Sequence, residues 1–152
     1  MTTRSVSHAS FTITRRWKAS PARVFQAFAD AEQKYKWFAR SDDLTRVDRR
    51  MDFRENGREM VEGQWKSGMV SRFDCLYQDI VANERILYSY VMHLDGRKIS
   101  VSQACIELTA DGSGTTFVLT EYGDYLDGYD DAGRREHGTN ALIDALAASL
   151  GE

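Results

Sequence analysis

One carboxylate of this sequence, Glu121, is placed where acid–base chemistry or ligand binding would need it. The stretch 115–122 is rich in β-branched and aromatic residues, which is typical of a strand. Successive side chains of a strand point to opposite faces, so Glu121 shares a face with Phe117 and Leu119. We therefore expect an inward-pointing carboxylate. Burial of such a group is costly unless it is paired, and burial raises its pKa.

Two interpretations of Glu121 are open. In the structural one, Arg134 or Arg135 neutralises its charge, or it lies at the solvent rim of the sheet. In the functional one, a few side chains are the polar contacts of an otherwise apolar pocket: Tyr88, Gln103, Glu121 and Arg135. General acid–base catalysis by Glu121 and a tyrosine is a variant of the functional interpretation.

The stretch 133–150 predicts the helix that would carry Arg135. At 3.6 residues per turn, one of its faces carries Thr139, Leu142, Ile143, Leu146 and Leu150. The opposite face carries His137, Asp144 and Ala148. Arg135 extends the inward face toward the N-terminus, so that face is polar where the helix starts and aliphatic where it ends. We expect one end of the helix to seal a core and the other to border a cavity.

Asp95-Gly96 predicts a tight hairpin beneath this helix, because both central residues of a type I′ turn need positive φ. A regular register from that turn predicts the facing pairs Met92–Ile99, Tyr90–Val101, Tyr88–Gln103 and Ile86–Cys105. We assign this face to the concave side of the sheet, with Gln103 as its one strongly polar member. Asn56-Gly57 predicts a second tight hairpin, with the pairs Glu55–Arg58 and Arg54–Glu59.

The remaining stretches predict the elements that complete the fold. Residues 10–18 alternate as a first strand. Ser20-Pro21 is typical of a helix N-cap followed by proline at the first helical position, and Asp30 can cap a second short helix. From residue 44 onward we expect an antiparallel meander, with strands near 58–66, 69–81, 85–94, 98–109 and 115–122. We predict a single α+β domain over residues 1–152: a curved antiparallel sheet of about six to seven strands wrapped around a long C-terminal helix, with two short helices after strand one.

Five stretches carry a family resemblance that covers roughly residues 8–150: SPARVF at 20–25 with Trp37-Phe38, DFRENG at 52–57, NERILYSY at 83–90, GTTFVLTEYG at 114–123, and the leucine-rich C-terminal helix. With these residues the chain resembles the START-like or SRPBCC superfamily, the helix-grip fold, and more narrowly the branch named after activators of the heat-shock-protein-90 ATPase. The resemblance implies a pocket between sheet and helix. Members of the superfamily bind lipids, hormones and polyketides, or catalyse cyclisation and dehydration.

Several other functions lack the residues they need. The stretch 63–68 has no lysine and hydroxyl after its second glycine, so it is a turn and not a phosphate-binding loop. The acidic loop after residue 123 does not match an EF-hand, and we interpret it as a solvated loop whose tyrosines could form a lid. The three histidines cannot be placed together, so we expect no metal. A net charge of −3 gives no drive toward nucleic acid, and no apolar run approaches a membrane span.

We therefore expect a cytoplasmic protein with reduced Cys75 and Cys105, no cofactor, and a small hydrophobic or amphipathic ligand. An enzyme of the polyketide cyclase or dehydratase type is one alternative, and a chaperone-interacting module is another. The expected ligand-binding residues are Trp37, Phe38, Tyr88, Tyr90, Met92, Gln103, Glu121, Arg135, Thr139 and Leu142.

Overall fold

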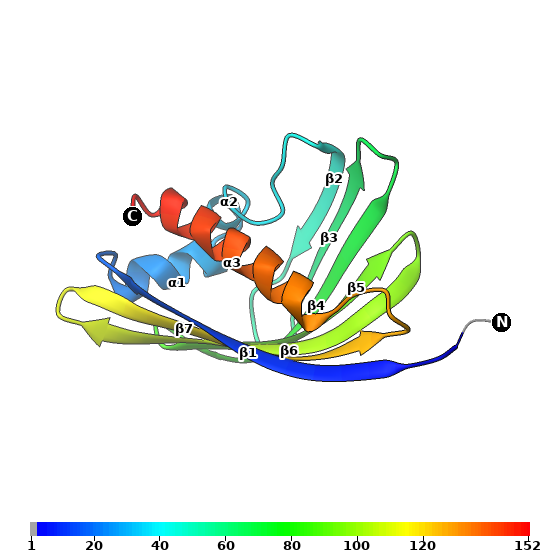
Figure 1. The fold of residues 1–152 in the computed structure, drawn as a ribbon. Helices are drawn as coiled ribbons and strands as arrows, with labels where there is room; N and C mark the ends of the chain where they lie inside the picture. Colours follow the sequence, from blue (N-terminus) through cyan, green and yellow to red (C-terminus); the bar gives the residue numbers. More distant parts are fainter. Residues whose placement is uncertain (1–2) are drawn as a thin grey trace.

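The computed structural model describes residues 3–152 as one antiparallel sheet that curves around a long helix (Figure 1). The strands are β1 (Val6–Trp17), β2 (Leu44–Met51), β3 (Arg58–Trp65), β4 (Val70–Val81), β5 (Arg85–Leu94), β6 (Arg97–Asp111) and β7 (Gly114–Leu126). Their spatial order is β1-β7-β6-β5-β4-β3-β2. The short helices α1 (Pro21–Ala29) and α2 (Ala31–Lys34) follow β1, and α3 (Ala132–Ser149) ends the fold. The predicted helix-grip α+β fold is confirmed.

Side-chain caps fix where two of the helices begin. Ser20 accepts a hydrogen bond from the backbone N–H of Arg23 at 3.2 Å, and Pro21 occupies the first position of α1, as its sequence predicts. Asp131 accepts from the backbone N–H of Arg134 at 2.9 Å, so α3 begins one residue before the predicted Gly133. Among residues 3–152, no helix combines the length and hydropathy that crossing a bilayer requires.

The core lies between the C-terminal half of α3, helix α1 and the β1–β7–β6 part of the sheet. Ile143 and Leu146 are 1% and 0% exposed, on the face of α3 that the 3.6-residue period predicts. They join one apolar cluster with strand residues such as Ile106 and Phe117 and with residues of α1 such as Phe28. Trp17 and Phe28 also pack on Phe117, with ring centroids 4.8 and 6.3 Å from it.

The Asp95-Gly96 turn forms as predicted, but the register beyond it is shifted by one residue. Asp95 and Gly96 have φ of 51° and 76°, and His93 pairs with Lys98. Ile99 is then an extra residue, a β-bulge, because Met92 pairs with Ser100. The predicted pairs Met92–Ile99, Tyr90–Val101, Tyr88–Gln103 and Ile86–Cys105 are therefore wrong. The observed pairs are Met92–Ser100, Tyr90–Ser102, Tyr88–Ala104 and Ile86–Ile106.

The physical reason for this shift is the hydrophobic pattern further along β6. The shifted register buries Ile106 and Leu108, which are 0% and 5% exposed, whereas the regular register would turn both toward solvent. The shift also moves Gln103 to the convex face, where it is exposed, and brings Ser100 and Ser102 to the concave face.

Asn56-Gly57 does not form the predicted two-residue hairpin. Met51 pairs with Glu59, so residues 52–57 form a longer connection between β2 and β3. Within it, the N–H of Asn56 donates to the carbonyl of Tyr77, and the N–H of Tyr77 donates to the carbonyl of Gly57. The pairs Glu55–Arg58 and Arg54–Glu59 are wrong because Asn56-Gly57 extends the pairing with β4. Glu59 points inward as a result and is 1% exposed.

Two substitutions on α3 test which of its faces is buried. Leu146→Ala should lower the free energy of unfolding by about 2–5 kcal/mol, since it deletes a buried leucine. Asp144→Ala, on the exposed face, should change it by no more than about 0.5 kcal/mol. Urea titration measures both values. Equal losses in the two variants would mean that α3 is rotated relative to this description.

Candidate functional site

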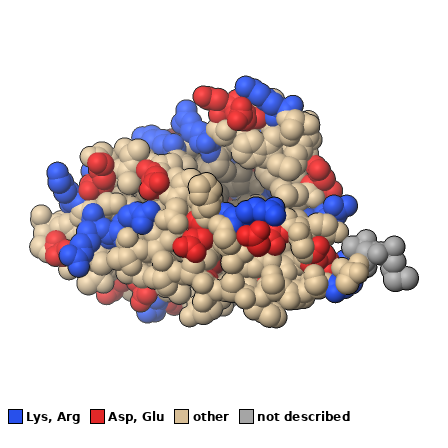
Figure 2. Space-filling model, in the orientation of Figure 1, with Lys and Arg blue, Asp and Glu red and all other residues tan. Residues whose placement is uncertain are grey.

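A cavity of about 430 Å³ opens between the concave face of the sheet and the N-terminal half of α3. Figure 2, in the orientation of Figure 1, shows that the surface is hollowed between α3 and the part of the sheet around β2 and β3. Most of the wall is apolar or aromatic: Phe28, Trp37, Phe38, Val61, Phe73, Met92, Leu119, Leu142 and Ile143. A concave, largely apolar space with a few polar groups is typical of a small-molecule site.

The structure brings the predicted site residues together around this cavity, with one exception. Trp37, Phe38, Tyr88, Tyr90, Met92, Glu121, Arg135, Thr139 and Leu142 all line it. Gln103 does not, because the Ile99 bulge turns it to the convex face. There it borders a shallow depression with His8 and Tyr122. Ser100 and Ser102 take its place as polar residues on the concave face.

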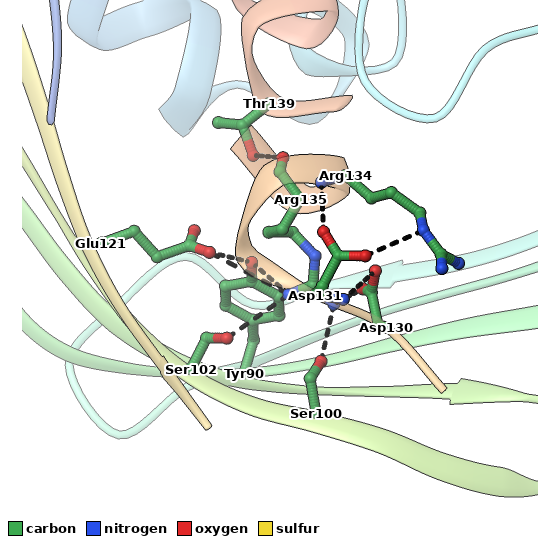
Figure 3. A network of polar contacts seen from close by, with 9 residues as sticks. All are labelled: Tyr90, Ser100, Ser102, Glu121, Asp130, Asp131, Arg134, Arg135 and Thr139. Carbon is green, nitrogen blue, oxygen red and sulfur yellow. Dashed lines mark hydrogen bonds and ion pairs between the residues drawn. The ribbon is translucent and has the colours of Figure 1, made fainter. Parts of the chain in front are cut away.

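Arg135 is the centre of a polar network at one end of the cavity (Figure 3). One guanidinium nitrogen, Nη1, donates to the Tyr90 hydroxyl at 2.9 Å and to Ser102 Oγ at 3.4 Å. The other, Nη2, donates to Ser100 Oγ at 2.7 Å and to Asp130 Oδ2 at 2.8 Å. Both nitrogens are thus committed to protein acceptors. Arg135 therefore links α3 to the sheet, and it is not free to bind the carboxylate of a ligand through two hydrogen bonds.

Glu121 lies beside this network and is 2% exposed. Its Oε2 accepts a hydrogen bond from the Tyr90 hydroxyl at 2.8 Å and lies 4.0 Å from Arg135 Nη1. Burial raises the pKa of Glu121 to about 7, although the Tyr90 hydrogen bond and the Arg135 charge oppose the increase. In Figure 3 the second oxygen of Glu121 makes no contact with the residues drawn. A carboxyl that titrates near neutral pH therefore borders the cavity.

A second polar cluster, at the α2 end of the cavity, was not predicted from the sequence. Lys34 Nζ lies 2.5 Å from Glu59 Oε1, and the Tyr77 hydroxyl donates to the same oxygen at 2.5 Å. Glu59 and Tyr77 are each 1% exposed and Lys34 is 6% exposed. The available indication was that Glu59 shares strand parity with the apolar Val61. The mistaken Asn56-Gly57 register concealed it by pairing Glu59 with Arg54.

Side-chain contacts hold the acidic loop in place. Asp124 pairs with His8, Asp127 with Arg4 and Asp131 with Arg134. The predicted lid of tyrosines is wrong: Tyr125 belongs to β7 and is 1% exposed, and Tyr129 packs under the guanidinium of Arg97. Among residues 3–152, no three His, Cys, Asp or Glu side chains are grouped so that they could hold a metal ion.

The fold and the cavity together define a START-like, helix-grip protein. The model of the family described as "Activator of Hsp90 ATPase homolog 1-like protein" matches residues 18–151, and the chain belongs to this family. No curated protein matches the sequence.

Solved structures similar to this chain include an uncharacterised protein from Rhizobium leguminosarum, with 39% identity, a TM-score of 0.94 and 99% of each chain covered. A protein from Rhizobium loti is 41% identical, with a TM-score of 0.89 over 95% of this chain and 99% of the other. An AHSA1-like protein from Aeromonas hydrophila shares the fold at 19% identity, with a TM-score of 0.71 and coverage of 94% and 92%.

The raised pKa of Glu121 predicts a specific dependence of stability on pH. Below about pH 4.5 the carboxyl is protonated in the folded and unfolded chains, and above about pH 7 it is ionised in both. Between these values the folded chain keeps a proton that the unfolded chain has lost, so stability falls as pH rises and then levels off. Glu121→Gln removes this contribution. The difference in unfolding free energy, wild type minus variant, should fall by on the order of 3 kcal/mol from about pH 4 to about pH 8.

Urea titrations across this pH range measure the difference. Glu136→Gln is the matched control, because Glu136 is exposed on α3 and its carboxyl stays in water when the chain folds. The Glu136→Gln curve should run parallel to that of wild type. A wild-type minus Glu121→Gln difference that stays constant with pH would show that Glu121 is not buried in the way described.

Proposed function

We propose that the protein binds a small hydrophobic or amphipathic molecule in the cavity between the sheet and α3. The observation that carries this proposal is the inward carboxyl of Glu121 on the wall of a mostly aromatic and aliphatic space of about 430 Å³. An apolar body would replace water along the wall, and a polar group would meet Glu121. Because Arg135 is already committed to its own partners, a hydroxyl is a better match for this end of the cavity than a carboxylate.

The cavity combines polar groups with an aromatic wall, which supports an amphipathic ligand over a purely apolar one. Phe38, Phe73 and Tyr90 form a connected aromatic wall, with ring centroids 5.2 and 5.1 Å apart in turn. Thr139 of α3 lines the cavity near Arg135, and its hydroxyl donates to the Arg135 carbonyl at 2.8 Å. The Thr139 hydroxyl therefore already has an acceptor within α3.

The hydrogen bond between Tyr90 and Glu121 favours a second candidate function, catalysis of the cyclase or dehydratase type. An enzyme of this kind needs a base near neutral pH and a hydroxyl within reach, and Glu121 has a pKa of about 7 and a 2.8 Å contact with Tyr90. As a base, Glu121 would take a proton from the carbon that lies between the carbonyl and the hydroxyl-bearing carbon of a β-hydroxyketone. The electron pair of that C–H bond would form the new C=C bond as the C–O bond breaks. The leaving hydroxyl would take the proton back from Glu121 and depart as water.

A phenyl-substituted β-hydroxyketone distinguishes binding from catalysis, because its loss of water gives a conjugated enone that absorbs in the near ultraviolet. Catalysis by Glu121 requires an acceleration that increases with pH through about 7 and disappears in Glu121→Gln while the compound still binds. Binding of the compound without any acceleration leaves ligand binding as the function.

A chaperone-interacting module is the third candidate, and it rests on the family description alone. The cavity supports ligand binding over this candidate, since a docking module needs a surface and not an interior space.

Cys75 and Cys105 are free thiols, which supports the proposed cytoplasmic location.

Filling the cavity tests the proposed binding site directly. Naphthol, a flat apolar compound with one hydroxyl, should raise the Tm of wild type by several degrees, because a ligand at 100 times its Kd stabilises a protein by about 2.7 kcal/mol. Thr139→Trp places an indole in the cavity and should abolish this increase. Differential scanning fluorimetry measures both.

Ala141→Trp is the matched control, because it adds the same ring at an exposed position of α3. It should respond to naphthol as wild type does. The proposal fails if Thr139→Trp still responds, or if neither naphthol nor fatty acids and sterols raise the Tm of wild type.

A further inference from the structure

The buried cluster of Lys34, Glu59 and Tyr77 is separate from the Arg135 network. Lys34 comes from the end of α2, Glu59 from β3 and Tyr77 from β4. Glu59 Oε1 accepts hydrogen bonds from both Lys34 and Tyr77. Glu59 Oε2 is buried and has no donor among residues 3–152. One oxygen of this buried carboxylate therefore accepts two hydrogen bonds, and the other accepts none from the described residues.

Stability alone does not account for this cluster. Replacing a buried ion pair by apolar side chains of similar volume is often neutral or even stabilising. An unsatisfied carboxylate oxygen adds to the desolvation cost, and buried polar atoms normally have a partner. A costly polar group that is retained at the edge of a cavity is typical of a functional site.

Lys34 is the member of the cluster that faces the cavity. An ammonium group has three N–H donors, of which one reaches Glu59. A second reaches the Tyr77 hydroxyl at the long distance of 3.5 Å. The third has no acceptor among residues 3–152, and Lys34 lines the cavity with its ammonium 4.5 Å from the centre of the Phe38 ring. An oxygen acceptor in the cavity would complete its coordination.

A row of three tyrosine rings lies between Lys34 and Glu121. Tyr77, Tyr88 and Tyr90 stand in a row on the concave face, with successive ring centroids 6.3 and 6.0 Å apart. Tyr77 contacts Lys34 at one end of the row, and Tyr90 contacts Glu121 at the other. The cavity therefore offers a hydrogen-bond donor at one end, an acceptor at the other and flat rings between them.

We propose that Lys34 is a second polar contact of the cavity and donates to the carbonyl oxygen of a ligand whose opposite end carries a hydroxyl that donates to Glu121. This inference rests on the proposed ligand-binding function and narrows the ligand class to flat hydroxylated ketones. Lys34 and Arg135 each have a carboxylate partner, Glu59 and Asp130. Neither cation is left unpaired, so a neutral carbonyl fits this cavity better than a carboxylate.

Three probes with the same aromatic body separate the two contacts: naphthol carries the hydroxyl, acetylnaphthalene carries the carbonyl, and hydroxyacetylnaphthalene carries both. Isothermal titration calorimetry with wild type should show that the compound with both groups binds most tightly. A hydrogen bond to a charged donor should contribute about tenfold or more in Kd.

The informative variant is Lys34→Met combined with Glu59→Gln. Lys34→Met alone would leave the buried Glu59 without its counter-ion and could unfold the chain, whereas the double substitution removes both charges and keeps the side-chain volumes. Thermal unfolding of the double variant confirms that it is folded before titration. Lys66→Met is the matched control, because it removes one lysine charge from the exposed surface.

The double variant should bind the two ketones about tenfold more weakly, with the affinity for naphthol unchanged. Lys66→Met should change none of the three values. If the double variant binds both ketones as wild type does, or loses naphthol by the same factor, the cluster is structural and the inference is overturned. If none of the three probes binds to wild type but a fatty acid or a sterol does, this inference is overturned and the proposed function stands. If fatty acids and sterols also fail to bind, both are overturned.

Discussion

The position of α3 on the sheet is the constraint on which the rest of the structure depends. Ile143 and Leu146 are buried against the β1–β7–β6 part of the sheet and helix α1, and this contact places the helix off-centre on the concave face. The sheet has seven strands, more than one helix can cover. The cavity lies on the rest of the concave face, where Val61 of β3, Phe73 of β4 and Tyr90 of β5 line it. Figure 1 shows these strands rising beside α3.

Polar contacts at the start of α3 replace the apolar packing that holds its end. Arg135 bridges Tyr90 and Ser100 of the sheet and Asp130 of the preceding loop. These bonds satisfy the arginine and anchor the start of the helix to the sheet. The same arrangement leaves Glu121 buried beside this cation, and the loss of solvation on burial raises its pKa more than the Tyr90 hydrogen bond and the Arg135 charge lower it.

Patterns that depend on neighbouring residues predicted the fold well. The 3.6-residue period placed Ile143 and Leu146 inside, strand parity placed Glu121 inside, and Ser20-Pro21 marked the start of α1. The START-like resemblance supplied the connection between these elements, which local patterns cannot give. The site could be predicted to the extent that it lies on these elements, as Arg135, Thr139 and Tyr90 do.

The errors arose where a tertiary constraint overrode a local rule. Asp95-Gly96 correctly predicted its turn, but the requirement to bury Ile106 and Leu108 shifted the register by one residue at Ile99 and moved Gln103 out of the site. Asn56-Gly57 is a strong hairpin pattern, yet here these residues pair with β4. Glu59 was therefore missed. The cluster of Lys34, Glu59 and Tyr77 joins three elements distant in sequence, and no spacing rule connects them.

The bulge at Ile99 also has a consequence for how the family can vary. Lys98 pairs with His93 and Ser100 pairs with Met92, so Ile99 is the one residue between Arg97 and Glu107 that has no partner on β5. A homologue lacking this residue could pair every other position of β6 in the same way and keep its two serines beneath the arginine. Deletion of Ile99 would remove a side chain that is 4% exposed, but it would leave the pairs on either side of the bulge, and so the chemistry of the cavity wall, unchanged.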